Sequence, residues 1–120
     1  MKNRTLKVYI AGALESNVSG YVQNINRMIT WSEKVRKLGC AVFVPAIDIL
    51  LGMVAGDWEY EDYFNNSQPW LDCADAVFLV PEWENSKGTK REIERAKQQR
   101  IPIFDDVEKL ATFIHSREAT

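Results

Sequence analysis

The sequence predicts an α/β domain in which a parallel β-sheet of four or five strands lies between two layers of helices. Short apolar runs typical of strands alternate along the chain with longer segments of helical periodicity. The clearest run, Asp75–Val80, is apolar at consecutive positions after its first residue, as expected of a strand that is buried on both faces. A length of 120 residues is typical of one domain, so we expect residues 1–120 to fold as a single unit.

The first half of the chain contains two predicted strands with one long helix between them. The β-rich run Leu6–Ala11 ends at Gly12 and is the first predicted strand. Between residues 21 and 38 the apolar side chains recur at helical spacing, and a glycine follows as a stop signal. The apolar run 41–44 is closed by a proline and is predicted as the second strand.

The stretch after the second strand allows two assignments. Residues 47–57 are compatible with a short helix or with a packed loop, because two glycines interrupt their apolar pattern. Two separate helical pieces are predicted next, over residues 58–64 and 69–73.

The last third of the chain shows the clearest alternation of elements. The strand 75–80 stops at a proline, a helix is predicted over 87–99, and residues 101–104 form a last short strand. A helix over 107–115 follows, with Asp105 or Asp106 as its N-cap. Strands that are joined by helices in this way form parallel sheets with right-handed crossovers.

Composition argues against several classes of protein. The net charge is only −2 and no basic arm is present, so we expect no nucleic-acid polymer as a partner. The two cysteines, Cys40 and Cys73, lack zinc-site spacing, and the one histidine, His115, lies near the C-terminus, which argues against a Ser-His-Asp triad. We therefore expect neither a metal nor a cofactor.

The N-terminal residues, the lengths of the apolar runs and the two cysteines predict the cellular location. The first residues are polar and lead directly into a strand, which is unlike a signal peptide, and no apolar run approaches the about 18 residues of a membrane span. Both cysteines lie in apolar surroundings and are interpreted as buried free thiols. These features predict a cytoplasmic protein without a membrane partner.

The candidate site lies where the loops after the first three strands converge. Ligands of open parallel sheets bind beyond the carboxyl ends of the strands, at the point where the strand order reverses. The third loop leads into Ser86, a predicted helix N-cap, with Gly88 and Thr89 in the first turn and Glu92 one turn later. Free backbone N–H groups at such a start bind anions, and the helix start favours an ionised Glu92. A capped surface helix with an ordinary glutamate is the alternative interpretation.

Residues of the second loop can add contacts to a ligand. Asp48 follows the second strand and is placed either to hydrogen-bond a base or ribose or to cap the next helix. Aromatic residues near the expected cleft could stack on a nucleobase or could belong to the core or to a subunit interface; they are Trp58, Tyr60, Tyr63 and Trp83.

Four motifs in the chain resemble the nucleoside 2-deoxyribosyltransferase superfamily, including its small nucleotide-hydrolase members and related uncharacterised phage and bacterial proteins. The matching segments run in order from the first strand to the last, and they are Val8-Tyr9-Ile10-Ala11-Gly12, Ala74–Val80, Trp83–Ala96 and Arg100-Ile101-Pro102-Ile103. The third segment is the strongest match, with a Gly-Thr pair, a glutamate three residues after it and an alanine four residues further on.

The resemblance implies a flavodoxin-like, nucleoside deoxyribosyltransferase-like fold and a role for each matching residue. Glu92 matches the nucleophile that attacks the anomeric carbon, and Ser86 matches the position that holds a 5′-phosphate in the hydrolases. Tyr9 and Gly12 match the loop that borders the sugar and its phosphate. Gly88, Thr89 and Asp48 complete the expected substrate-binding set.

Two positions depart from the superfamily pattern. An aspartate that orients the substrate and protonates the base is replaced here by Ser67, and Asp62, Asn66 or Asp72 could substitute for it without being in register. A phosphate-binding serine after the first-strand glycine is replaced by Ala13, with Ser16 and Ser19 nearby.

The expected activity is cleavage of the N-glycosidic bond of a nucleoside or deoxynucleoside 5′-monophosphate, with transfer of the sugar to water or to a second base. The alternative is a non-catalytic nucleotide-binding or regulatory module of the same fold, which the change at Ser67 favours. A structural subunit is the third possibility. Relatives complete the site with neighbouring subunits, so a homodimer or larger homo-oligomer is expected by analogy.

Overall fold

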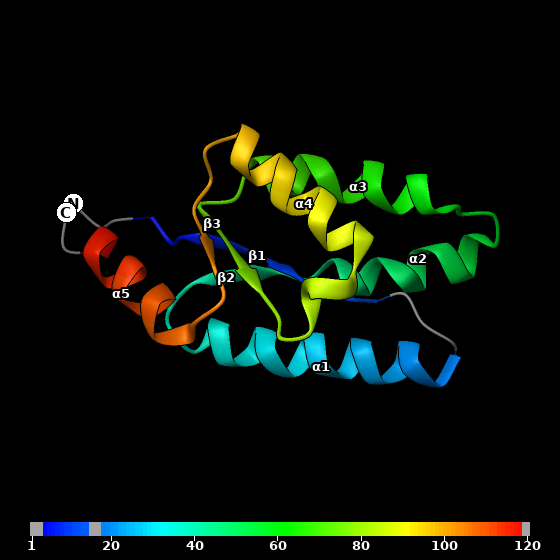
Figure 1. Cartoon of the computed structure of the whole chain (residues 1–120), viewed down its shortest axis with the longest axis horizontal. Helices are drawn as coiled ribbons and strands as arrows, with labels where there is room; N and C mark the ends of the chain where they lie inside the picture. The colour runs from blue at the N-terminus through cyan, green and yellow to red at the C-terminus, as the bar shows by residue number, and fades with distance from the viewer. Residues whose placement is uncertain (1–3, 15–17, 119–120) are drawn as a thin grey trace.

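The central sheet contains four parallel strands in the order β2-β1-β3-β4 (Figure 1). The computed structural model describes residues 4–14 and 18–118, with the backbone alone at 18, 19, 21 and 118. The strands of this described part are β1 (Lys7–Ala11), β2 (Ala41–Phe43), β3 (Ala76–Leu79) and β4 (Ile103–Phe104). The order reverses direction between β1 and β3, so the loops after these two strands lie on either side of a crevice.

Helices cover both faces of the sheet and complete a three-layer sandwich (Figure 1). The first and last helices pack on one face, and the third and fourth pack on the other. The described helices are α1 (Val18–Arg36), α2 (Asp48–Ala55), α3 (Tyr60–Asp72), α4 (Lys87–Gln98) and α5 (Val107–Glu118), with single 3-10 turns η1 (Pro45–Ile47) and η2 (Trp83–Asn85). This architecture confirms the α/β, flavodoxin-like fold predicted from the alternating pattern.

Alternation along β1 separates the two cores. Val8 and Ile10 point into the core beneath α1 and α5, whereas Tyr9 and Ala11 point into the core beneath α3 and α4. All four residues are at most 1% exposed, as expected for a central strand of a parallel sheet. Tyr9 is therefore a polar residue in an apolar layer, and its hydroxyl requires a partner.

The segment between β2 and β3 differs from the prediction in one respect. Two separate helical pieces were expected, but α3 is continuous from Tyr60 to Asp72 and contains Pro69. The proline lies in the last turn, where it removes only one backbone N–H from the helix. At the other end a capping box between Glu59 and Asp62 fixes the start. Residues 47–57, which allowed a helix or a loop, form α2.

The ends of the helices confirm one predicted cap and correct one prediction of burial. Asp106 accepts a hydrogen bond from the backbone N–H of Lys109 and so caps α5. Cys40 is buried as predicted, but Cys73 is exposed because it is the C-cap residue of α3, outside the sheet-facing stripe.

Candidate active site

A cavity of about 430 Å³ opens at the carboxyl ends of the first three strands, where the loops were expected to converge. Residues from the loop after β1, from α2 and from the start of α4 share its lining. All the predicted site residues except one are in the lining, namely Gly12, Asp48, Ser86, Gly88, Thr89 and Glu92. The exception, Tyr9, is buried behind Glu92 and bonds to it.

The start of α4 forms one wall of the cavity, which we call the α4 wall (Ser86, Gly88, Thr89 and Glu92). Ser86 caps the helix as predicted, since its Oγ accepts a hydrogen bond of 3.1 Å from the Thr89 N–H. The Thr89 hydroxyl donates to the same oxygen at 3.0 Å. Because Thr89 is the donor in this bond, the Ser86 O–H proton remains available to a ligand. The cap satisfies the Thr89 amide, and the amides of Lys87 and Gly88 before it have no acceptor in the helix.

Glu92 is held by a buried phenol. The Tyr9 hydroxyl donates a hydrogen bond to Glu92 Oε2. Burial raises the pKa of the Glu92 carboxyl to about 7, and the bond from Tyr9 opposes that rise. Burial and the Glu92 charge also hold the pKa of Tyr9 well above its usual value, so the phenol keeps its proton.

This environment opposes the effect of the helix start, which was expected to favour an ionised Glu92. The helix macrodipole acts within the first turn, and Glu92 lies in the second turn of α4. Removal of water from the carboxyl therefore outweighs the helix effect, and near neutral pH the group exchanges readily between its two protonation states.

The opposite side of the cavity is formed by α2 and α3 and is called the α2–α3 wall. Its lining side chains are mostly apolar or aromatic, and they are Asp48, Ile49, Met53, Tyr60, Tyr63, Phe64 and Ser67. Two of the four aromatic residues flagged in the sequence, Tyr60 and Tyr63, line the cavity, and Trp58 packs edge-on against Tyr63. Trp83 instead packs against the core beneath α3 and α4.

Ser67, the residue that departs from the superfamily pattern, lies inside the site. It is 6% exposed, lines the cavity and interacts through its hydroxyl with Tyr9. The suggested acidic substitutes Asp62 and Asp72 serve other purposes. Asp62 belongs to the capping box of α3, and Asp72 accepts two hydrogen bonds from Arg95, at 2.8 and 2.7 Å.

Asp48 is the acidic residue that the α2–α3 wall presents to the cavity. It does not cap α2, because Ile47 occupies the N-cap position. Its side chain instead accepts a hydrogen bond of 3.1 Å from the Asn66 amide. The Asp48 charge also contributes to the raised pKa of Tyr9, so the two groups are electrostatically coupled.

Two glycines set the shape of the cavity. A Cβ at Gly12 would lie 2.7 Å from Met28 Sδ and 3.0 Å from Val80 Cβ, so the loop after β1 packs tightly on the core. A Cβ at Gly52 would lie 1.8 Å from the Tyr63 hydroxyl, so this glycine makes room for an aromatic side chain of the α2–α3 wall. In the sequence, Gly52 is one of the two glycines that interrupt the apolar pattern of residues 47–57, and that pattern does not indicate this packing role.

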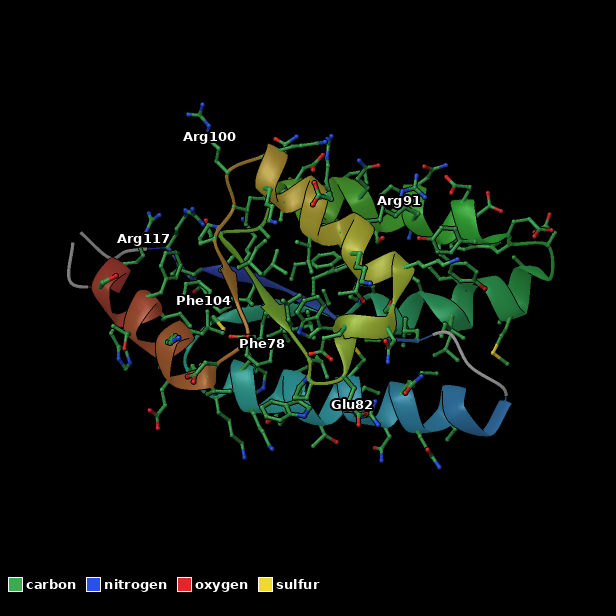
Figure 2. The ribbon with its side chains drawn as sticks, in the orientation of Figure 1. Phe78, Glu82, Arg91, Arg100, Phe104 and Arg117 are labelled. Carbon is green, nitrogen blue, oxygen red and sulfur yellow. The ribbon has the colours of Figure 1, made fainter. Side chains whose placement is uncertain are left out.

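Ion pairs outside the cavity hold its walls together. Arg91 donates to both carboxylate oxygens of Glu61, at 2.6 and 3.2 Å, and its guanidinium lies 3.5 Å from the centre of the Phe64 ring. Figure 2 shows Arg91 on the α4 side that faces α3. Together with the pair between Arg95 and Asp72, this contact fixes α4 against α3 and hence Glu92 against the aromatic wall.

A stack of three aromatic rings includes Tyr9, the residue that bonds to Glu92. The Tyr9 ring stacks on Phe43 with centroids 5.6 Å apart, and Phe43 stacks on Trp70 at 5.5 Å. Trp70 is 58% exposed, so the stack extends from the buried strand β1 to the surface.

Charge in the lining comes from carboxylates and not from cations. No Lys or Arg is among the lining residues that the structure describes, so an anion here would depend on the N–H and O–H groups of the α4 wall. In residues 4–14 and 18–118 no group of three or more His, Cys, Asp or Glu side chains is arranged to bind a metal. No described helix has the length and apolar character needed to cross a bilayer.

Comparisons with known proteins place the chain in a family without assigning it an activity. No curated protein matches the sequence significantly. The family described as a domain of unknown function, DUF4406, matches residues 6–105, which span all four strands and every predicted site residue. The chain therefore belongs to the DUF4406 family.

Proposed function

We propose that the protein cleaves the N-glycosidic bond of a nucleoside or deoxynucleoside 5′-monophosphate, with Glu92 as the nucleophile. The observation that carries this proposal is a carboxyl group in the wall of a ligand-sized cavity, bonded to a buried tyrosine and adjacent to an anion-binding helix start. The resemblance to nucleoside 2-deoxyribosyltransferases supports it independently, because the same glutamate matches their nucleophile.

In the proposed reaction the ionised form of the Glu92 carboxyl group is the nucleophile. The ionised Glu92 attacks the anomeric carbon of the sugar, and the base leaves with the bonding electron pair and takes up a proton from water. Water, or a second base, then releases the sugar from the glutamyl ester. Tyr9 orients the attacking carboxylate through its hydrogen bond to Glu92.

A phosphate group has a matching position at the start of α4. The remaining O–H proton of the Ser86–Thr89 pair and the amides of Lys87 and Gly88 are the donors that the helix start offers to a phosphate in the cavity. A 5′-phosphate at this position would leave the sugar over Glu92, further along the same helix. No cofactor is needed for this chemistry.

A homo-oligomer is part of the proposal. Apolar side chains that line or border the cavity are largely exposed, including Val22 at 65% and Met53 at 70%. Val54 next to them is 89% exposed. Such a patch is typical of an interface, and a second subunit seated here would close the cavity. The buried free thiol of Cys40 agrees with a cytoplasmic location.

The test is an assay of free base released from a panel of nucleosides and their 5′-monophosphates. Base release by the wild type and its loss in Glu92→Gln would support the proposal. Nucleotide binding without release from any substrate would favour the binding module, and Ser67 would be the residue to convert to aspartate. Size measurement in solution with and without Val54→Glu tests the oligomer.

A further inference from the structure

Asp48 is a buried carboxylate in the cavity lining that forms no ion pair with the described residues. It is 8% exposed, it lines the cavity, and none of the ion pairs among the described residues includes it. A carboxylate that is removed from water without a cation requires hydrogen-bond donors. Among the described residues one donor is present, the Asn66 amide on Oδ2.

The second oxygen of Asp48 is accessible to solvent or to a ligand. No described buried side-chain oxygen or nitrogen lacks a hydrogen bond, yet Asp48 Oδ1 has no bonding partner. That oxygen therefore has accessible surface, and the surface of Asp48 borders the cavity. The bond from Asn66 fixes the carboxylate plane, so Oδ1 is a positioned acceptor with lone pairs available to a ligand.

The sheet determines which end of a nucleotide reaches Asp48. Asp48 follows β2, Tyr9 belongs to β1, and the α4 wall follows β3, in the spatial order β2-β1-β3. Two strand spacings separate the outer positions by about 10 Å. A ligand with its phosphate at α4 and its anomeric carbon at Glu92 therefore extends its base toward β2.

We infer that Asp48, oriented by Asn66, is the base-recognition residue and selects substrates whose base carries an amino group on the edge that faces α2. This inference rests on the proposed function. A carboxylate accepts from an amino N–H and repels a carbonyl oxygen at the same place, so an amino base is favoured over its oxo counterpart. The rings of the α2–α3 wall bind either base by stacking and do not discriminate between them.

The experiment measures binding separately from chemistry. Six nucleoside 5′-monophosphates form three matched pairs, adenine with hypoxanthine, guanine with xanthine, and cytosine with uracil. Dissociation constants are measured by calorimetry on Glu92→Gln, which keeps the cavity and prevents turnover, and base release is measured on the wild type. In the pair that binds most tightly, the amino member is expected to bind about 10-fold or more tightly.

The variants assign that preference to Asp48. Asp48→Asn, made in the Glu92→Gln background, is expected to reduce the preference to about 3-fold or less, or to reverse it. The matched control Asp57→Asn removes an exposed carboxylate near Asn66 that does not line the cavity, and it should keep the preference. Asn66→Ala leaves Asp48 in place without its orienting bond and should weaken the preference partially, which tests the inference even where Asp48→Asn does not fold.

The outcomes separate the inference from the proposed function. Equal or tighter binding of the oxo members, or an unchanged preference in both Asp48→Asn and Asn66→Ala, overturns the inference while base release would still support the proposed function. An amino preference that depends on Asp48, without base release by the wild type, supports the inference and contradicts the proposed function. Absence of binding by all six compounds overturns both.

Discussion

The two walls of the cavity were built from the sequence in different ways. The α4 wall comes from one short segment in which a cap, a glycine, a threonine and a glutamate follow one another within two helical turns. The α2–α3 wall comes from residues that meet only because two helices pack together, as Asn66 meets Asp48 and Tyr63 meets Gly52. Local helix geometry thus positions Glu92, the proposed nucleophile. Tertiary packing positions Asp48, the proposed base-recognition residue.

The largest expected effect lies on the α4 wall. Glu92→Gln should lower base release roughly 10³-fold or more, because it removes a group that acts on the transition state, while nucleotide affinity changes little. The isosteric side chain can still accept the bond from Tyr9, so the thermal midpoint should not fall. Full activity in this variant would show that the reactive group lies elsewhere, for example on the opposite wall.

The second effect is a pH dependence of stability that belongs to Glu92. Its pKa is raised in the folded protein from 4.5 to about 7, so the folded state binds more protons than the unfolded state between these values. The free energy of unfolding should therefore fall as the pH rises through that window, by up to about 3 kcal/mol. Urea titrations of wild type and Glu92→Gln at several pH values measure this, and the variant should lack that part of the slope.

Ser86→Ala separates capping from ligand binding on the same wall. Loss of the cap should lower the free energy of unfolding by about 1 kcal/mol. Loss of a hydrogen bond to a charged phosphate should weaken binding of a 5′-monophosphate by roughly 1.5–3 kcal/mol, and the plain nucleoside should be affected little. Calorimetry with both ligands gives the difference. Equal weakening of the two would argue against a phosphate at the start of α4.

The smallest effect compares one glycine from each region. In Gly52→Ala the new Cβ would clash with Tyr63, so the ring must shift and stability should fall by about 1–2 kcal/mol. In Gly88→Ala the nearest atom, the Tyr60 hydroxyl, is 3.3 Å away, and stability should change by less than about 0.5 kcal/mol. Denaturant midpoints decide between them. A larger loss at Gly88 would mean that the α4 wall is the more tightly packed one.

Sequence patterns predicted the fold and the α4 wall because both depend on short-range order. Parallel strands such as β3 are recognisable from consecutive apolar residues, and a cap such as Ser86 is recognisable from its place before a helix. The raised pKa of Glu92 was not predicted, since the extent of burial is a property of the whole packing. For the same reason nothing in the sequence paired Asn66 with Asp48. The two residues belong to different helices and meet only because α2 and α3 pack together.

The stack of Tyr9, Phe43 and Trp70 has a consequence for how this site can be tuned. The hydroxyl that orients Glu92 belongs to the innermost of three rings, and the outermost ring lies at the surface on a different element of the chain. The packing that supports the Tyr9 ring therefore extends to a side chain that is open to solvent. If the proposed function holds, a substitution at Trp70 is expected to change base release through the support of Tyr9, although Trp70 does not line the cavity.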